Sequence, residues 1–174
     1  MEALGCVEEA QAFRWQCFER TLNSAHLRAY LKRLPDFEDI DAEQRAMSTA
    51  LRFSEVHQAL AFLVSWPALE KAAALVLARA TELNGDHYEV LSPAADALTA
   101  KYPLAATLIL RAMIDFSLKR NRVKRYRHAA RHLAECESLA TAVGDFRNFE
   151  PHEHYAARLK SEHGRKTSFW SLVS

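Results

Sequence analysis

Alanine and leucine dominate this chain, and that bias limits what it can fold into more than any motif does. Thirty of its 174 residues are Ala and 22 are Leu, whereas Gly occurs 4 times and Pro 5 times. Ala and Leu are among the strongest helix formers, while Gly and Pro are typical of the turns that join short strands. No segment alternates apolar and polar residues with enrichment in β-branched side chains. We therefore expect an all-α protein.

The spacing of the expected helices indicates how they are arranged. Helices are expected to start near residues 54, 67, 87, 103 and 124, so alternate starts recur every 33 to 37 residues. This spacing is typical of helix-turn-helix repeats of the tetratricopeptide type, which have 34 residues per unit. The Trp-Leu-Gly-Tyr consensus of that family is absent. We predict stacked antiparallel helix pairs in a tetratricopeptide-like α-solenoid, with an irregular compact helical bundle as the alternative.

Local signals predict several helix boundaries. A first helix is expected over residues 8–22, and Ser24 is placed to cap the second. Asp41 with Gln44 matches a capping box that would open a third helix. Pro67 suits the first position of another helix, and Pro93 is expected to kink or restart the helix that contains it.

A length of 174 residues with 49% hydrophobic content predicts one globular domain over 1–174.

Short motifs along the whole chain carry a family resemblance. They are residues 28–37 (RAYLKRLPDF), 66–69 (WPAL), 84–89 (NGDHYE), 93–95 (PAA), 125–133, 149–153 (FEPHE), 163–166 (HGRK) and 169–172 (FWSL). In these motifs the chain resembles an uncharacterised family of proteobacterial proteins, classed as a domain of unknown function. The resemblance implies helical-repeat architecture and no assigned activity. It also implies that the chain corresponds to the C-terminal part of longer members, so that Met1 lies inside a helical pair.

The ending is also similar to the C-terminal helical region of SWIM zinc-finger proteins. That finger needs a Cys-x-Cys…Cys-x-His set of zinc ligands, and this sequence lacks the set. No zinc or DNA role therefore carries over from this likeness.

Charge is distributed unevenly along the chain. The net charge is +1, but residues 1–100 hold 15 acids and 9 bases, whereas residues 101–174 hold 7 acids and 14 bases. The basic excess is concentrated in Lys119, Arg120, Arg122, Lys124, Arg125, Arg127 and Arg131. No acid lies between Asp115 and Glu135, so this segment is predicted to attract an anion or an acidic partner. The alternative is a solvated face whose first two cations stabilise a helix C-terminus.

The first helix predicts an interface. Its apolar residues Phe13, Trp15, Phe18 and Leu22 spread over more of the helix than one core contact requires. Because an exposed apolar area of that size is typical of an interface, we expect self-association there, as a two-fold dimer. The alternative is that both faces of this helix are covered within the chain, for instance by helices after residue 40. At the other end of the chain, Phe169 and Trp170 are expected to dock on the last two helices, since two free aromatics would expose a large apolar area.

Metal sites and catalysis are not expected. His128 and His132 share a helix face with Glu135, but the basic flanks would repel a cation. We expect these histidines to face solvent or a hydrogen-bond partner. The acidic stretch 36–43 lacks the Gly and Glu positions of an EF-hand loop. GxSxG, HExxH and Gly-rich phosphate motifs are all absent. The sequence therefore predicts no cofactor and no enzyme activity.

These features together predict an interaction protein. The three cysteines, Cys6, Cys17 and Cys136, form no CxxC pair, and neither a signal peptide nor an apolar run of bilayer length is present. We expect a soluble cytoplasmic module that binds a protein partner or another copy of itself, with no membrane role. The alternative is a nucleic-acid-associated accessory protein that uses segment 119–131, although Tyr126 is the only aromatic residue there.

Overall fold

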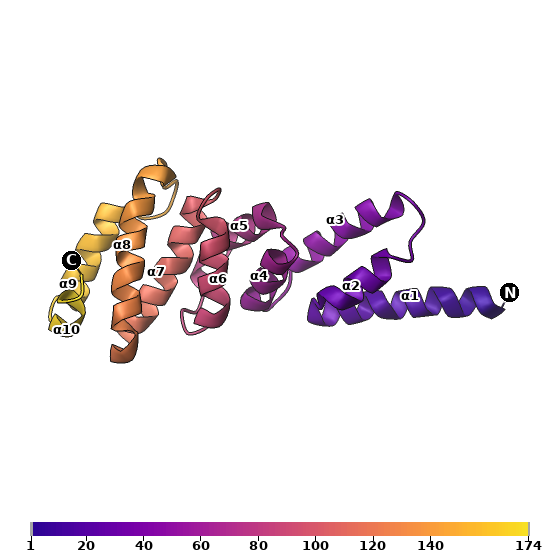
Figure 1. Cartoon of the computed structure of the whole chain (residues 1–174), viewed down its shortest axis with the longest axis horizontal. Helices are drawn as coiled ribbons and strands as arrows, with labels where there is room; N and C mark the ends of the chain where they lie inside the picture. Colours follow the sequence, from indigo (N-terminus) through magenta and orange to yellow (C-terminus); the bar gives the residue numbers. More distant parts are fainter. Residues whose placement is uncertain (1, 174) are drawn as a thin grey trace. The chain divides into compact units, whose positions relative to one another are not determined.

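The fold is entirely helical in the part of the chain that the structure describes. The computed structural model describes residues 2–173, and the side chains of residues 7–173 (Figure 1). Every regular element within residues 2–173 is an α-helix or a short 3-10 helix, which confirms the predicted fold class. The chain divides into two compact units, unit 1 over Met1–Ala72 and unit 2 over Ala73–Ser174. The prediction that they form a single domain stays a prediction.

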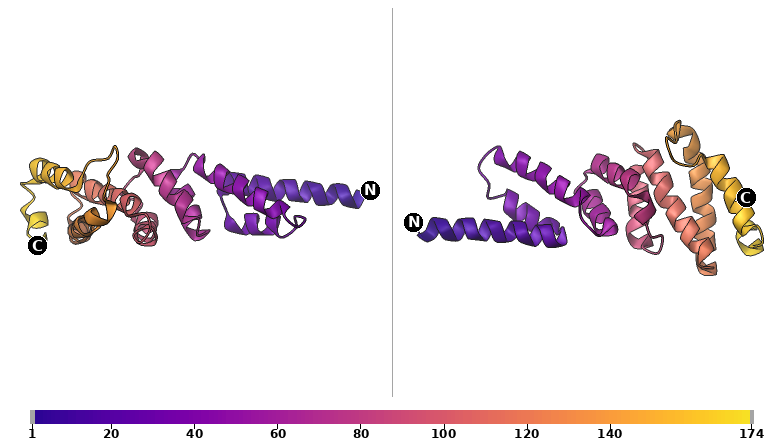
Figure 2. Two further views of the ribbon diagram at one scale, coloured as in Figure 1. Left: turned by 90° about the horizontal axis from the view of Figure 1, so that it is seen from above. Right: turned by 180° about the vertical axis from the view of Figure 1, so that it is seen from behind.

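Unit 1 contains four helices and the start of a fifth. They are α1 (Glu2–Thr21), α2 (Ser24–Leu31), α3 (Glu38–Leu51), α4 (Val56–Ser65) and the beginning of α5 (Leu69–Ala78). α1 and α2 pack side by side and run in opposite directions (Figures 1 and 2). The buried ring of Phe18 on α1 lies 5.3 Å from the ring of Phe62 on α4, measured between centroids. Phe18 of α1 is therefore part of the core of its own unit.

Unit 2 is organised around one long helix. It contains the rest of α5, η1 (Ala80–Glu82), α6 (Tyr88–Leu98), α7 (Pro103–Lys119), η2 (Val123–Arg125), α8 (Tyr126–Val143), α9 (His152–His163) and α10 (Thr167–Trp170). α7 packs between α6 and α8, and short turns make each neighbouring pair antiparallel. Most of the α7 side chains are buried, because α7 has a neighbour on both sides.

Several helix boundaries differ from those predicted. Asn23, not Ser24, caps α2, because its Oδ1 accepts a hydrogen bond from the Ala25 N–H at 2.8 Å. α3 begins at Glu38 rather than Asp41, immediately after Phe37, whose φ is +75°. The predicted capping box is therefore wrong, since Asp41 lies inside the first turn.

The two proline predictions also need correction. α5 begins at Leu69, two residues after Pro67. α6 runs continuously through Pro93, so the predicted restart is wrong. The missing N–H of one proline removes one hydrogen bond of the helix, and the packing of α6 on α7 outweighs that loss.

The C-terminal aromatics are docked, as predicted. Phe169 is fully buried, and its ring meets that of Tyr126 edge-on at 5.8 Å between centroids. The Trp170 Nε1–H donates to the carbonyl of His163 at 2.8 Å, and α10 packs against α8. Only Leu172 of the predicted apolar tail is exposed. Phe169 is thus part of the unit 2 core, whereas Trp170 is half-buried at its edge.

The turn before α6 approaches α7 closely at Gly85. A Cβ atom at this position would lie 2.2 Å from the Ala112 carbonyl oxygen and 2.7 Å from the Phe116 Cβ. Neither contact is possible, so the turn can lie against α7 only because position 85 has no side chain.

Within the described residues, no helix has both the length and the apolar character needed to cross a membrane.

Candidate anion and partner-binding site

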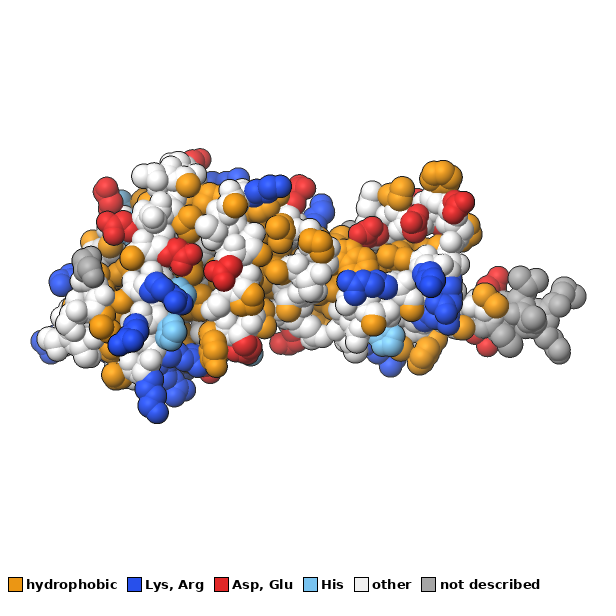
Figure 3. Space-filling view, in the orientation of Figure 1, with side chains coloured by type: hydrophobic (Ala, Val, Ile, Leu, Met, Phe, Trp, Pro, Cys, Tyr) orange, Lys and Arg blue, Asp and Glu red, His pale blue; other side chains and the backbone are white. Residues whose placement is uncertain are grey.

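The predicted basic segment surrounds one end of unit 2. It covers the end of α7, η2 and the first half of α8, and in the space-filling view Lys and Arg side chains gather around the lower end of α8 (Figure 3). Its seven side chains, named together the basic surface, are Lys119, Arg120, Arg122, Lys124, Arg125, Arg127 and Arg131. All of them are exposed except Arg125, which is half-buried. The structure therefore brings the predicted residues to the surface of one unit.

A pocket of about 360 Å³ opens beside the basic surface, between α6, α7 and the start of α8. Lys124, Arg125 and Arg131 contribute positive charge to its lining. Met113 and Tyr88 add apolar surface. This basic pocket therefore combines cationic and apolar walls, a combination that suits an acidic ligand with an apolar side chain.

Arg125 is held in place by contacts within the unit. Its Nη1 lies 2.9 Å from Oδ1 of Asp86. Its guanidinium carbon lies 4.7 Å from the ring centroid of Tyr88 and 5.6 Å from that of Phe116. An arginine that is ion-paired and stacked on two rings is a fixed wall of the basic pocket, and its charge is already compensated.

His132 is buried, in contrast to the prediction that it faces solvent or a hydrogen-bond partner. Only 7% of the residue is exposed, its Nδ1 has no hydrogen-bond partner among the described residues, and the nearest carboxylate oxygen, on Glu135, is 3.8 Å away. Burial, together with the charges of Arg131 and His128, lowers the pKa of His132 to about 4. His132 is therefore neutral near pH 7, whereas His128 is exposed as expected.

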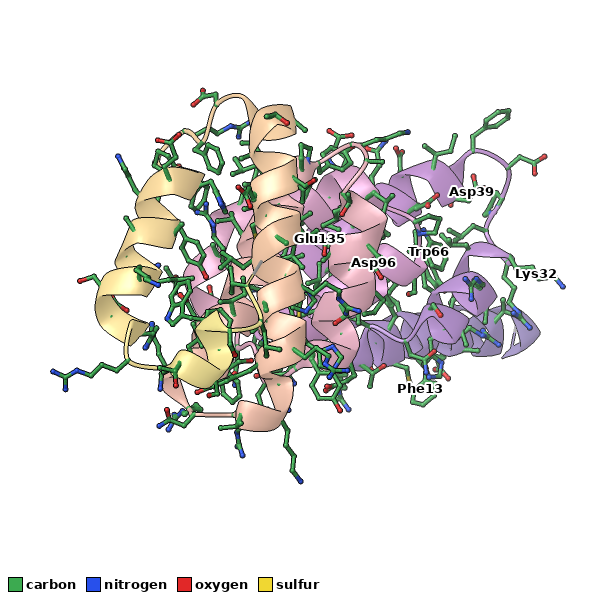
Figure 4. All side chains as sticks on the ribbon, turned by 60° about the vertical axis from the view of Figure 1, so that its left-hand side comes forward. Phe13, Lys32, Asp39, Trp66, Asp96 and Glu135 are labelled. Carbon is green, nitrogen blue, oxygen red and sulfur yellow. The ribbon has the colours of Figure 1, made fainter. Side chains whose placement is uncertain are left out.

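Two carboxylates lie one helical turn beyond the basic pocket. Figure 4 shows Asp96 on α6 and Glu135 on α8, the two helices that pack on α7. Burial and the charge of Asp96 both raise the pKa of Glu135.

No three His, Cys, Asp or Glu side chains in the described part of the chain lie close enough to hold a metal ion.

A second polar site, which the sequence did not predict, centres on Arg111 of α7. Only 6% of Arg111 is exposed, its Nη1 donates to the carbonyl of Glu150 at 2.6 Å, and its guanidinium carbon lies 4.3 Å from the ring centroid of Tyr155. The Tyr155 hydroxyl donates to Asp115 at 3.0 Å. The Arg158 guanidinium contacts Glu150 at 3.2 Å and Asp115 at 3.8 Å.

The Arg111 network, as we name these five residues, lines a groove of about 560 Å³ between α7 and α9. Its two arginines and two carboxylates are equal in number, but the ion pairs to Glu150 and Asp115 are made by Arg158, whereas Arg111 is held by the Glu150 carbonyl and the Tyr155 ring. Burial and the charge of Asp115 raise the pKa of Tyr155 well above its ordinary value, so its hydroxyl remains a donor. The sequence signal that was missed is the pair Arg111 and Asp115, four residues apart inside an apolar helix.

The predicted self-association residues divide into buried and exposed members. Phe18 and Leu22 are buried within the chain, so they are not available for an interface. Trp15 is half-buried, and the Arg45 guanidinium carbon lies 3.7 Å from its ring centroid. Phe13 is 65% exposed and projects from α1 (Figure 4). Self-association through the first helix stays a prediction, with Phe13 as its main exposed apolar side chain.

Unit 1 exposes a second apolar feature at residues 36–43, which we name the acidic tip. The side chain of Phe37 is 83% exposed and that of Ile40 is 55% exposed. Five exposed carboxylates surround them, from Asp36, Glu38, Asp39, Asp41 and Glu43. Hydrophobic and acidic side chains lie together over the start of α3 (Figure 3).

Comparisons with known proteins identify one family. A family model described as "Family of unknown function (DUF6880)" matches residues 1–172. No curated protein and no solved structure matches the chain. The resemblance to a family of unknown function is thus confirmed over almost the whole chain, whereas the proteobacterial origin and the likeness to SWIM proteins stay predictions.

Proposed function

Because the chain belongs to the DUF6880 family, which has no assigned activity, we propose its function from its own surface. We propose a non-catalytic protein-interaction module that binds an acidic segment of a partner protein through the basic surface of unit 2. The basic pocket receives an apolar side chain of that segment, and the surrounding cations pair with its carboxylates.

The observation that carries this proposal is the lack of compensating charge. Ion pairs to described carboxylates are made by Arg125, and by Lys119 with an N–O distance of 4.0 Å to Asp115. The other five cations of the basic surface have no described acidic side chain within ion-pair distance. Such unmatched charge attracts acidic partners and speeds their association.

The arrangement of helices supports an interaction role. We propose that the antiparallel helices continue as a tetratricopeptide-like stack, and stacks of helix pairs present extended surfaces to partners. The cysteine pattern supports a cytoplasmic location, since three cysteines without a CxxC pair suit a reducing compartment.

A nucleic acid is the second candidate partner, because phosphates would also be attracted to the basic surface. Single-stranded nucleic acids bind proteins largely by stacking their bases on exposed aromatic rings. Tyr126, the aromatic residue within the basic segment, is buried and packed against Phe169. The exposed ring beside the basic surface, Tyr88, already has the Arg125 guanidinium over it at 4.7 Å. The basic surface therefore offers charge with little free ring surface for stacked bases, which favours the acidic protein segment.

Fluorescence polarisation with the full chain tests the proposal. The probe is a labelled 12-residue peptide of Asp and Glu with one central Phe, and it is compared with the same peptide lacking Phe and with a 20-nucleotide DNA. We expect binding of the Phe peptide that weakens with added salt. The double variant Lys124→Glu, Arg131→Glu should bind at least tenfold more weakly, whereas Arg165→Glu, an exposed charge outside the basic surface, should bind normally. Tighter binding of DNA, or no binding of any probe, contradicts the proposal.

A further inference from the structure

The acidic tip of unit 1 is opposite in charge to the basic pocket of unit 2. Five carboxylates occur in its eight residues, 36–43, whereas seven cations and no acid occur in the thirteen residues 119–131. We infer that the basic pocket receives the acidic tip of a second copy of this chain, so that copies assemble head to tail. This inference rests on the proposed function and names its partner.

Phe37 is the side chain that would enter the basic pocket. It is 83% exposed, and its backbone lies in the left-handed region with a φ of +75°. Both features are unfavourable for a large apolar residue in an isolated chain. Each is explained if the backbone conformation presents the ring to a surface that covers it, since strained residues are typical of binding sites.

The basic pocket matches such a ring in composition. Met113 and Tyr88 provide apolar contact surface, and the fixed guanidinium of Arg125 already stacks on two rings of its own unit. Lys124 and Arg131 line the same pocket. An inserted phenyl ring would therefore contact apolar atoms while Asp36, Glu38 and Asp39 beside it pair with the cations.

Phe13, the other exposed aromatic in unit 1, fits the pocket less well. Its sequence neighbours Ala12 and Arg14 are apolar and basic, and a single carboxylate, from Glu9, lies one helical turn away, against five around Phe37. A positive neighbour would be repelled by the basic surface. The acidic tip is therefore the occupant that charge complementarity selects.

The geometry of such a contact determines the form of the assembly. The acidic tip and the basic pocket are different surfaces, so a first contact leaves one free tip and one free pocket. Contacts of this heterologous kind add further copies unless a rotation closes them into a ring. The size of the assembly should therefore increase with protein concentration and decrease with added salt.

Sedimentation equilibrium of two complementary variants tests the inference. The tip variant is Phe37→Ser with Asp39→Lys, and the pocket variant is Lys124→Glu with Arg131→Glu. We expect the wild-type chain at low salt to exceed the mass of a monomer, and each variant alone to remain a monomer. An equal mixture should form a dimer that does not grow, because the intact tip of the pocket variant binds the intact pocket of the tip variant.

Control measurements separate the outcomes. Circular dichroism confirms that each variant is folded, and Asp145→Lys, an exposed charge elsewhere, should assemble as wild type does. A wild-type chain that is monomeric at low salt overturns the inference, as does a mixture that stays monomeric while the wild type assembles. If the wild type nevertheless binds the acidic Phe peptide, the proposed function stands and only the second copy is excluded. If it binds no peptide, both fail.

Discussion

Two sets of charged side chains begin on the same helix, α7, and differ in how their charges are matched. Arg111 and Asp115 belong to a network in which Arg158 pairs with two carboxylates, the Tyr155 hydroxyl donates to Asp115, and Arg111 is held by a backbone carbonyl and the Tyr155 ring. One turn further along, Lys119 and Arg120 begin the basic surface, where five of seven cations have no described acidic partner. The number of charges is therefore a poor guide to their role. Pairing separates the charges that stabilise the fold from those available to a partner.

The largest effect should come from breaking the Arg111 network. Arg111→Ala is expected to lower the free energy of unfolding by about 4 kcal/mol, because it leaves a cavity and removes the buried partner of the Glu150 carbonyl and of the Tyr155 ring. Urea denaturation followed by circular dichroism measures the change. Arg122→Ala, on the basic surface, should change it by less than about 0.5 kcal/mol. Similar losses for the two variants would show that the two sets of charges do not differ in their contribution to stability.

His132 belongs to neither set of charged side chains: it is buried, yet it lines the basic pocket. The pH dependence of stability tests whether it stays neutral there. Its pKa is about 4 in the folded chain, against 6.5 for an ordinary histidine. The unfolded chain therefore binds the proton first as the pH falls, so stability present above pH 6.5 is lost between pH 6.5 and 4. At 1.36 kcal/mol per pKa unit, the full loss is about 3 kcal/mol.

Urea denaturation of the wild type and of His132→Gln at several pH values isolates this contribution. Burial also lowers the pKa of His152 and His163, so both proteins should lose stability in acid, and the wild type should lose more. Parallel pH profiles for the two proteins would show that His132 does not titrate as described.

A smaller effect is expected from one hydrogen bond of the Arg111 network. Tyr155→Phe removes the hydroxyl that donates to Asp115 at 3.0 Å while keeping the ring beneath Arg111. The free energy of unfolding should fall by about 1 kcal/mol, because Asp115 keeps its contact with Arg158. Tyr88→Phe, at an exposed tyrosine, is the matched control and should have almost no effect on unfolding by urea.

The smallest effect on stability should come from the basic surface itself. Lys124→Glu with Arg131→Glu is expected to change the free energy of unfolding by less than about 0.5 kcal/mol, since neither residue has a described ion-pair partner to lose. The same variant should lose binding of the acidic peptide. A loss of stability comparable to that of Tyr155→Phe would show that these cations support the fold.

Sequence patterns predicted features that depend on neighbouring residues along the chain. α7 begins at Pro103, where a helix start was expected, and proline suits the first position of a helix. The basic surface was also predicted, because charge is read directly from composition. Phe37 was not predicted, since nothing in its sequence context requires a left-handed backbone.

Features that depend on packing between helices were not predictable in the same way. The spacing of His128 and His132 shows that they share a face of α8, but not that one of them lies under α6 and α7. That outcome depends on the rotation of α8 about its axis, which its contacts with α7 determine. The Arg111 network likewise joins residues about forty positions apart, through the Arg111 bond to Glu150 and the Tyr155 bond to Asp115.

Gly85 lines both the basic pocket and the groove of the Arg111 network. The turn that contains Gly85 therefore lies between the pocket proposed for recognition and the groove of the Arg111 network. Since a Cβ atom at position 85 would lie 2.2 Å from the Ala112 carbonyl oxygen, any other residue must move this turn away from α7. A side chain at position 85 would therefore alter the walls of both cavities together, so a substitution there cannot be used to reshape one cavity alone.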